Sequence, residues 1–452
     1  MAYKNLITYN SKVSQVSRDF YSPEALIGGQ PLTTLYSFLY KVDPWVDDNF
    51  PDQPRQDQQY IKSVFANMFV AKKITSNDIS PVIQRIDWIS GTTYDFYQDN
   101  IDMFAKDVDG YPIYQFYVKN TYDQVFKCLW NNNGQASTQM PFFQPGTYGT
   151  DNIFQSTDGY KWKYMYTVST GLKVKFMDSS WIPVPIGANT PNPLLTNAGY
   201  GDIEVINVTN GGSGYDPANA TISVTVTGDG TGASGTAVVS GGVITDVIVT
   251  NTGSNYSYAN VAITSTSGSN ATAIAPASPV GGHALDPISE LGCRNLMVSV
   301  EFNGSEGGVI PTDITYHQLG IIINPTTTQT SPIPASGEIY PTTTNLVIAS
   351  GFGAYVSDEI IYQGSSLASA TFTATVLSFD VGNNVVKLIN TVGTPVTNAP
   401  VFGTTSGTTR TLLTYNVPNY TLFSGYMSFV ENRSAIQRSV DGIEQFKIVL
   451  GY

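Results

Sequence analysis

The sequence has few of the residues on which disulfides, transition-metal sites and long charged helices depend. Its 452 residues include two cysteines and two histidines, and only 13% of the residues are charged. So few charges exclude a coiled coil, which needs charged flanking positions, and also a disordered chain kept open by charge. Cys128 and Cys293 do not make a disulfide framework, and their apolar sequence contexts indicate two buried thiols.

The two histidines do not form a metal-binding pattern with the cysteines, because the four residues are dispersed along the chain. We interpret His317, within a predicted strand at 316–323, as a half-buried histidine with satisfied hydrogen bonds. His283 follows two glycines, which indicates a hinge residue. We therefore expect no metal site and no cofactor.

Cations are scarce in the second half of the chain, and the formal net charge is −13. Residues 1–175 hold 16 Lys and Arg against 17 Asp and Glu, whereas residues 176–452 hold 6 against 18. Nucleic acids and anionic membranes both attract cations, so we expect neither as a partner. No apolar run approaches the roughly 20 residues of a membrane span, and the N-terminal segment lacks a signal-peptide core. These features predict a soluble chain that is not exported by the usual route.

The spacing of apolar residues predicts one clear helix and many strands. Apolar side chains at 61, 64, 65, 68 and 69 form one helical stripe, so we expect a helix over 57–73. Asp57 can cap its start, and Lys72 and Lys73 complement the negative end of the helix dipole. Elsewhere, short runs rich in Val, Ile, Thr, Tyr and Phe between turn residues predict strands, for example at 161–168 and 172–176. The expected fold is mainly β with minor α.

A change of composition near Asn189 predicts an inserted module at 189–282, rich in Gly, Ser and Thr. The sequence that starts at Val208 recurs in similar form from Val249, an offset of 41 residues. We expect each copy to pair a strand with a turn whose tyrosine, Tyr215 or Tyr256, covers a small core. Low-complexity disorder is the alternative, but alternating β-branched residues provide a face to bury.

A second module is predicted at 335–420, as a small β barrel or sandwich of about five strands. The turn at 381–384 separates two strand-like runs and indicates a hairpin. The remaining ranges, 1–188, 283–334 and 421–452, carry core-like apolar strands. Together they predict a multidomain protein with a discontinuous, β-sandwich-like body and two inserted small β modules.

Three patterns resemble catalytic or ligand-binding motifs. Gly230–Gly235 matches a dinucleotide loop but leads into predicted strands rather than a helix, so we interpret it as a Gly-rich turn. The spacing around Asp107–Gly110 excludes a calcium-binding EF-hand and favours a simple turn. Asp95, Asp99 and Asp102 can supply two glycosidase carboxylates, whereas a solvated acidic face explains them equally well. We expect no enzymatic activity.

Several segments in order resemble the gene product eight family of baseplate wedge subunits from T-even-type contractile-tailed bacteriophages. The segments are Tyr40–Trp45, Val82–Trp88, Val125–Leu129, Asp158–Tyr166, Trp181–Pro185, His317–Pro325 and Met427–Arg433. We call these the signature segments. The resemblance covers most of 35–187, 314–325 and 424–452, and both predicted modules fall in its gaps.

This resemblance implies a late, structural virion protein without enzymatic activity, which acts in virus assembly. Such subunits are assembled in the host cytoplasm, form a homodimer in each wedge of the viral tail baseplate and contact other wedge subunits. The resemblance implies no nucleic acid, membrane or small-molecule substrate as a partner. A carbohydrate-binding or receptor-binding tail adhesin is the alternative, because aromatic-rich β modules with Thr, Asn and Gly loops also hold sugars.

The signature segments supply candidate signature or interface residues. These are Trp45, Trp88, Tyr160, Trp162, Trp181, Pro183, Glu431, Asn432 and Arg433. The four tryptophans can anchor an interface, but aromatic residues of a core give the same pattern. Low charge and many Tyr, Asn and Thr residues suit broad polar-aromatic interfaces.

Overall fold

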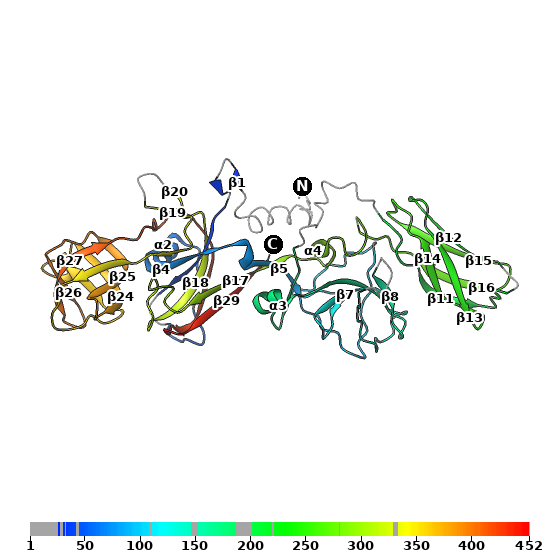
Figure 1. Cartoon of the computed structure of the whole chain (residues 1–452), viewed down its shortest axis with the longest axis horizontal. Helices are drawn as coiled ribbons and strands as arrows, with labels where there is room; N and C mark the ends of the chain where they lie inside the picture. Colours follow the sequence, from blue (N-terminus) through cyan, green and yellow to red (C-terminus); the bar gives the residue numbers. More distant parts are fainter. Residues whose placement is uncertain are drawn as a thin grey trace. The chain divides into compact units, whose positions relative to one another are not determined.

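The computed structural model describes residues 26–27, 30–31, 33–41, 45–108, 110–145, 152–186, 201–218, 221–279, 281–328 and 333–451 (Figure 1). Within these ranges the chain is mainly β, with three short α-helices. It forms two compact units. Unit 1 contains 80–297 and 449–451, and unit 2 contains 26–79 and 298–448. Both units draw on the ranges expected to form the body.

The elements of unit 1 are short strands, a six-stranded module and two helices. They are β5 (Ile79–Gln84), β6 (Tyr117–Lys119), β7 (Gln124–Trp130), β8 (Ile153–Gln155), β9 (Lys161–Thr167), α3 (Thr170–Phe176), β10 (Trp181–Pro183), β11 (Asn207–Ser213), β12 (Ile222–Gly228), β13 (Ser234–Ser240), β14 (Val243–Asn251), β15 (Ala259–Ser265), β16 (Ser269–Ile274) and α4 (Pro287–Glu290). Strands β5, β17 (Asn295–Asn303) and β29 (Ile443–Gly451) each cross a unit boundary in sequence.

The elements of unit 2 are mostly strands. They are β1 (Leu26–Ile27), β2 (Gln30–Pro31), β3 (Leu35–Tyr40), α2 (Gln58–Asn67), β4 (Met68–Ile74), β18 (Thr315–Ile323), β19 (Thr326–Thr327), β20 (Ile333–Pro334), β21 (Ile339–Pro341), β22 (Thr344–Ile348), β23 (Ile360–Gln363), β24 (Phe372–Asp380), β25 (Val385–Gly393), β26 (Pro400–Gly403), β27 (Thr409–Asn416) and β28 (Tyr426–Gln437). Single 3-10 turns lie at Ser76–Asp78 and Leu367–Ser369.

Unit 1 is organised around the antiparallel sheet β6-β7-β9-β8. Strand β7 is buried along its whole length, because both faces of the sheet are covered. Phe126 and Cys128 face an aromatic cluster with Trp162, whereas Val125 joins a second core with Met165. Burial raises the pKa of the Cys128 thiol. Both cysteines are buried and free, as predicted.

The 41-residue repeat folds into the six-stranded sheet β11-β16-β15-β12-β13-β14. Tyr215 and Tyr256, the equivalent tyrosines of the two copies, are both buried in its core, which confirms their predicted role. The alternating exposure along the strands gives the sheet one apolar face, and that face is incompatible with low-complexity disorder. Asn207 and Ile274 are paired, so the sheet begins and ends at neighbouring positions. The composition change near Asn189 lies outside the described residues.

The predicted helix at 57–73 is wrong beyond Asn67. Asp57 caps α2 through a hydrogen bond from the Tyr60 amide, as predicted, but Met68 begins strand β4. Strand β4 lies between β3 and β21, and its first four residues are all buried. A continuous apolar run suits such a central strand as well as a helix, which explains the error. Lys72 and Lys73 therefore lie on β4 rather than at a helix end.

The second correction concerns residues 172–176, which were predicted to form a strand and instead form most of α3. Ser169 caps this helix by accepting a hydrogen bond from the Leu172 amide. Leu172 and Phe176 are four residues apart and pack in one core cluster, while Val174 between them is exposed. Apolar residues at 172, 174 and 176 fit the two-residue period of a strand, but residues 172 and 176 alone also fit the four-residue spacing of a helix. The Ser169 cap favours the helix.

A closed six-stranded barrel, β22-β25-β24-β23-β26-β27, occupies 344–416. Its core contains Leu346, Val376 and Leu412 among other buried residues. The predicted hairpin at 381–384 is confirmed, because Asp380 of β24 pairs with Val385 of β25. Within the described ranges, none of the helices combines the length and apolarity that a membrane span requires.

Candidate interaction surfaces

The most buried candidates of the signature segments lie in the core of unit 1. Tyr160 and Trp162 have no exposed surface, and their rings stack with centroids 5.4 Å apart. Pro183 is buried on β10, opposite Val82 of β5. Trp181, at the start of β10, is half-buried and packs beside the Phe176 cluster. For these residues the core alternative describes the observed packing.

Asp158 begins the signature segment that contains Tyr160 and Trp162, and it holds the turn before β9. Its carboxylate accepts hydrogen bonds from the hydroxyls of Ser137 and Ser156 and from the amides of Thr138, Gln139 and Tyr160. Burial alone would raise the pKa of Asp158, but these hydrogen bonds lower it below its ordinary value. The role of this carboxylate is therefore to organise backbone. Trp88 contacts Ser137 as well, because its indole donates to that hydroxyl at 3.0 Å.

Three signature segments that are far apart in the sequence meet at Asn432 of β28. Its side-chain oxygen accepts hydrogen bonds from Tyr60 at 3.0 Å and from Gln318 at 2.8 Å, and the Tyr40 hydroxyl lies 3.2 Å away. Its amide nitrogen donates to the backbone oxygen of Asp52 at 2.6 Å. Asn432 thus connects β28, β18, β3 and α2 with the loop that precedes α2. Residues 42–44 of the first segment lie outside the described residues.

That loop, which we define as the 45–52 loop, is fixed to β28 at several points. The Trp45 indole donates to the backbone oxygen of Arg433 at 2.8 Å, and the Ser434 hydroxyl donates to that of Asp48. Inside the loop, the Phe50 amide donates to the Asp47 oxygen at 3.0 Å, which closes a turn. These contacts connect the loop to β28 through Trp45, Asp48 and Asp52 and close a turn inside it.

The 45–52 loop holds two apolar side chains in solvent. Val46 is fully exposed and Phe50 is 80% exposed, although Trp45 beside them is half-buried. Three aspartates, Asp47, Asp48 and Asp52, surround this pair in the sequence and give the loop a negative charge. Apolar side chains held on a well-defined loop, rather than scattered singly, indicate a binding surface.

His317 lies beneath the loop and is more buried than predicted. Its ring meets the Trp45 ring edge-on at 6.1 Å, and Nε2 lies 3.8 Å from the Asp48 carboxylate. Burial lowers the pKa of His317. Its Nδ1 has no hydrogen-bond partner among the described residues, so the prediction of a satisfied half-buried histidine is wrong. On the adjoining strand, Glu431 and Arg433 pair at 2.7 Å.

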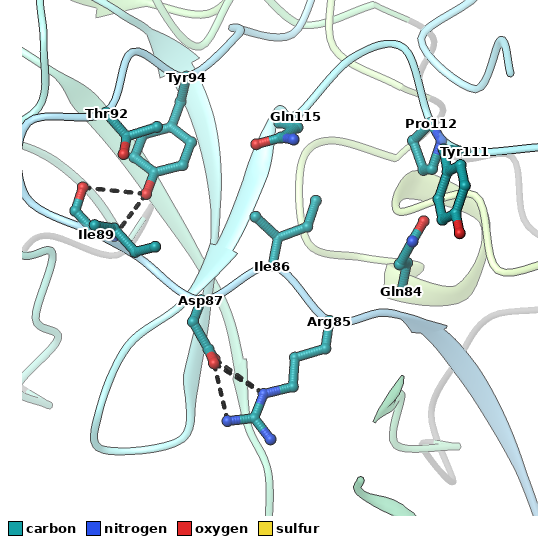
Figure 2. A pocket seen from close by; sticks show the side chains of 10 residues that line it. All are labelled: Gln84, Arg85, Ile86, Asp87, Ile89, Thr92, Tyr94, Tyr111, Pro112 and Gln115. Carbon is teal, nitrogen blue, oxygen red and sulfur yellow. Dashed lines mark hydrogen bonds and ion pairs between the residues drawn. The ribbon is translucent and has the colours of Figure 1, made fainter. Parts of the chain in front are cut away.

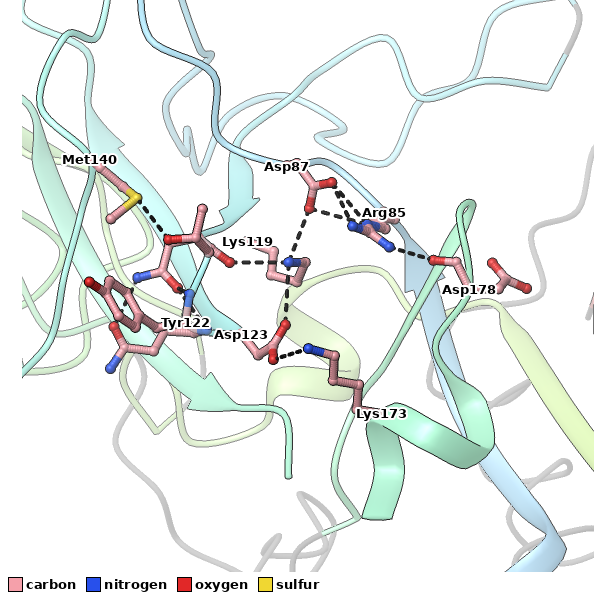
Figure 3. Close-up of polar contacts among 11 residues, drawn as sticks. Arg85, Asp87, Lys119, Tyr122, Asp123, Met140, Lys173 and Asp178 are labelled. Carbon is pink, nitrogen blue, oxygen red and sulfur yellow. Dashed lines mark hydrogen bonds and ion pairs between the residues drawn. The ribbon is translucent and has the colours of Figure 1, made fainter. Parts of the chain in front are cut away.

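Unit 1 carries an ion-pair network that begins in the signature segment Val82–Trp88. Figure 3 shows Asp87 in contact with both Arg85, at 2.9 Å, and Lys119, at 3.2 Å. Lys119 also contacts Asp123, which in turn pairs with Lys173 of α3 at 2.7 Å. Burial alone would raise the pKa of Asp87, but hydrogen bonds from Arg85 and the charge of Lys119 hold it below its ordinary value. The network joins loop, sheet and helix.

A pocket of about 420 Å³ lies beside this network (Figure 2). Figure 2 shows Tyr111 and Pro112 next to Gln84 on one side, with Tyr94 and Ile89 on the other. The Arg85 guanidinium at its edge is engaged by Asp87, so this pocket has no cation available for a ligand among its described lining residues.

An adjoining pocket has a volume of about 300 Å³. Its lining residues include Ile83, Met103, Phe104, Tyr114, Phe116, Trp181 and Leu291, with Lys106 and Arg294 as the charged members. The Arg294 guanidinium lies over the Phe104 ring at 5.7 Å. Lys106 is exposed and makes no ion pair with the described residues. We call this cavity the Lys106–Arg294 pocket.

Three buried lysines form the most strongly charged cluster of unit 1. Lys127 of β7 is paired directly with Lys163 of β9, and such like-charged cross-strand neighbours destabilise a sheet unless other groups compensate. Glu290 lies 3.1 Å from Lys127, and Glu204 lies 2.9 Å from Lys163. The third lysine, Lys161, contacts Asp246 of β14 at 2.8 Å. Acids from the module and its flanks thus neutralise three lysines of the signature segments.

His283 belongs to this cluster, so its interpretation as a hinge residue is wrong. It is buried, and its Nδ1 lies 3.0 Å from the Lys127 ammonium and 3.5 Å from Glu290. Burial and the neighbouring Lys127 lower the pKa of His283. Burial also lowers the pKa of Lys127, whereas Lys127 and His283 overcome the effect of burial on Glu290 and lower its pKa to about 2. Lys127 also lies 3.9 Å from the centre of the Tyr97 ring.

The remaining candidate acids accept hydrogen bonds from backbone amides. Asp95 accepts from Gln115, Asp99 from Ala277 and Asp102 from Phe104. Asp107 accepts from Tyr111 in the predicted turn. The Gly-rich motif at 230–235 leads into strand β13, as expected. Within the part of the chain that the structure describes, no group of three or more His, Cys, Asp or Glu side chains is placed to hold a metal ion.

Sequence reasoning missed both the lysine cluster and the 45–52 loop. The lysines occur at alternate positions within otherwise apolar strands, which is the one local signal of buried cations. Their acidic partners are 41 to 163 residues away, and nothing local identifies them. The structure thus offers two candidate interaction surfaces, the 45–52 loop with its exposed Val46 and Phe50 and the Lys106–Arg294 pocket. Comparison with protein-family models found no match for the chain, and comparison with curated proteins found none either.

Proposed function

We propose that this chain is a structural virion protein, a baseplate wedge subunit of a contractile phage tail. It acts by binding other wedge subunits and a second copy of itself, and by shifting with them when the baseplate rearranges. Its place in the virion is the tail baseplate, after assembly in the host cytoplasm. The collinear signature segments are the sequence evidence for this proposal.

The observation that carries the proposal is the 45–52 loop. A loop free to move would fold Val46 and Phe50 against the protein, because burial of each such side chain is worth roughly 1.5–3 kcal/mol. Hydrogen bonds from Trp45, Asn432 and Ser434 instead hold the loop in one shape. A pre-formed binding loop loses little conformational entropy on association, which favours tight assembly.

The charge clusters of unit 1 are consistent with a protein that transmits contacts. Each buried lysine connects a strand of the body to an acid that lies before, within or after the six-stranded module. Breaking such a pair leaves a buried charge without a partner, so these connections strongly resist local opening.

Co-expression with the wedge proteins of the same phage tests the proposal. The full chain should co-purify with at least one of them, and a Val46→Ser/Phe50→Ser variant should lose that association. Phe352→Ser is the matched control, because Phe352 is a fully exposed phenylalanine outside the loop. Failure to associate, together with glycan binding or glycan hydrolysis by the purified chain, would favour an adhesin or an enzyme instead.

A further inference from the structure

We propose that an acid-sensitive clamp fastens the six-stranded module of 207–274 to the rest of unit 1. The clamp is closed while the imidazole of His283 is neutral, and it opens when this imidazole takes up a proton. It consists of two strand lysines and three residues from the segments that flank the module: Lys127, Lys163, Glu204, His283 and Glu290. The inference goes beyond the proposed function and does not depend on it, because it concerns one chain alone.

The clamp connects both flanks of the module to the same pair of strands. Before the module, Glu204 accepts a hydrogen bond from Lys163 of β9 at 2.9 Å. After the module, the His283 imidazole lies 3.0 Å from the Lys127 ammonium of β7. The two flanks also contact each other, because the His283 amide donates to the other carboxylate oxygen of Glu204 at 2.6 Å. Displacement of His283 therefore breaks contacts with both the sheet and the opposite flank.

The contact between Lys127 and His283 requires a neutral imidazole. An ammonium group has only donors, so Nδ1 of His283 accepts this hydrogen bond, and it does so only without a proton. Glu290 lies 3.1 Å from the Lys127 ammonium and 3.5 Å from the same Nδ1. This one carboxylate balances one positive charge. A proton on His283 would place a second positive charge beside the first.

The other acidic groups that the structure describes around the clamp supply no spare anion to His283. They are Asp99, Asp202, Glu204 and Asp286. Glu204 already balances Lys163. Asp99 and Asp286 accept hydrogen bonds from backbone amides. Burial raises the pKa of Asp202 and of Asp286, which makes their charged forms less favourable still.

The side chains of the clamp are also shielded from water, which would otherwise screen a second charge. Lys127, His283 and Glu290 are all buried. The Tyr97 ring meets the His283 ring edge-on at 5.0 Å and lies 3.9 Å from the Lys127 ammonium. Burial raises the pKa of Tyr97, so its hydroxyl stays neutral and offers no countercharge. Two like charges this close repel each other far more strongly here than in water.

Opening of the clamp relieves this repulsion because it returns His283 to water. There its pKa approaches the ordinary value of about 6.5, whereas burial and the charge of Lys127 lower it in the closed clamp. The open form therefore binds more protons, and a falling pH favours it. Below about pH 6.5, the ratio of open to closed molecules rises by up to about tenfold for each pH unit, until the closed form also takes up the proton.

Opening at His283 leaves the module folded and tethered. The module has its own core around Tyr215 and Tyr256, separate from the core around Trp162 in the sheet β6-β7-β9-β8. Lys161 still connects the two, through Asp246 at 2.8 Å and the backbone oxygen of Ile206 at 2.9 Å. Acid thus frees the flank that follows the module, while the flank that precedes it stays attached.

Hydrogen exchange of the purified full chain tests the clamp. The amides of Ser278 and His283 report on opening, because they donate to Asp202 and Glu204 of the opposite flank. Their opening constant, corrected for the intrinsic exchange rate, should rise by about fivefold to tenfold between pH 7.5 and pH 5.5. Peptides from the barrel of 344–416 should show no such rise.

Two histidine variants assign the effect. His283→Asn removes the titration but keeps an acceptor for Lys127, because the amide oxygen of asparagine takes the position of Nδ1. Its opening constant should be the same at both pH values. His317→Asn is the matched control, since the chain has only these two histidines, and it should keep the rise of the wild type.

Three results would overturn the clamp. They are a wild-type opening constant that does not change with pH, a rise that persists in His283→Asn, and an equal rise in the barrel peptides. If His283→Asn does not fold, nitrogen-15 labelling of histidine in His317→Asn leaves the signal of His283 alone. That imidazole should be neutral at pH 7 and titrate below about pH 6.5, and a charged imidazole at pH 7 would also overturn the clamp. None of these experiments involves wedge proteins, so their failure leaves the proposed function untouched.

Discussion

Replacement of Glu290 with glutamine tests how much the buried ion pair with Lys127 stabilises unit 1. Glutamine keeps the shape of the side chain and one acceptor oxygen but removes the charge. The Lys127 and Glu290 side chains are 0% and 2% exposed, so water cannot replace the lost partner. Removing one member of a buried pair typically costs about 3–5 kcal/mol.

The titration of Lys127 sets an upper limit on this loss. A buried lysine without a counterion can release its proton, which costs about 4.6 kcal/mol at pH 7 for an ordinary pKa near 10.4. At pH 9.5 the same proton loss costs only about 1.2 kcal/mol. The pKa of Lys127 in the folded variant lies below its value in the unfolded chain, so the unfolded chain binds more protons in this range. The stability of Glu290→Gln should therefore rise with pH relative to the wild type.

Urea unfolding of both proteins at pH 7 and pH 9.5 measures the effect. We expect a loss of about 3–5 kcal/mol at pH 7 that shrinks to about 1–2 kcal/mol at pH 9.5. The double variant Lys127→Met/Glu290→Met is the control, because it removes both charges and should recover most of the loss. An equal loss at both pH values, or a loss below about 1 kcal/mol at pH 7, would refute the reasoning.

Three further predictions concern the turn at Asp158, the module and bound metals. Asp158→Asn should destabilise the chain by about 1–2 kcal/mol, because a half-exposed acceptor of several hydrogen bonds becomes a partial donor. The pKa of Asp158 is lowered in the fold, so the stability that its carboxylate contributes is present above its unfolded pKa and is lost as the pH falls. The free energy of unfolding of the variant, measured with urea, should therefore fall less steeply below about pH 4 than that of the wild type. Deletion of 207–274 with a short Gly-Ser bridge should leave the rest of unit 1 folded, because Asn207 and Ile274 are paired neighbours. Calorimetry should show a lower melting temperature, because the deletion removes Asp246 and leaves buried Lys161 without this partner. Lys161→Met should therefore partly restore the melting temperature of the deletion variant. A chelator should leave the melting temperature unchanged, and a drop of several degrees would reveal a metal that we have missed.

The fold class follows from the sequence where the local pattern has one interpretation. Tyr215 and Tyr256 recur at one offset in a β-rich repeat, and both cover the core of one sheet. The turn at 381–384 combines Gly and Asn between two alternating runs, and it closes the β24–β25 hairpin. In both cases the residues that determine the local structure, a turn tyrosine or a Gly-Asn turn, lie next to the strands that they organise.

Local sequence patterns do not predict the structure where a helix and a strand share the same apolar spacing, or where a residue contacts a partner far away in the sequence. Met68–Ala71 continues a helical stripe, yet its neighbours β3 and β21 make it a central strand. His283 has no local feature that places it beside Lys127, because that contact is created by sheet packing 156 residues away. The loop at 45–52 is likewise defined by strand β28, nearly 390 residues later.

Cryo-microscopy of intact virions of the phage that encodes this chain tests the central claim most directly. The account predicts density in the tail baseplate into which both the six-stranded sheet of 207–274 and the closed barrel of 344–416 fit, with two copies in each wedge. Density for these two modules at the capsid, or virions that lack the chain altogether, would contradict it.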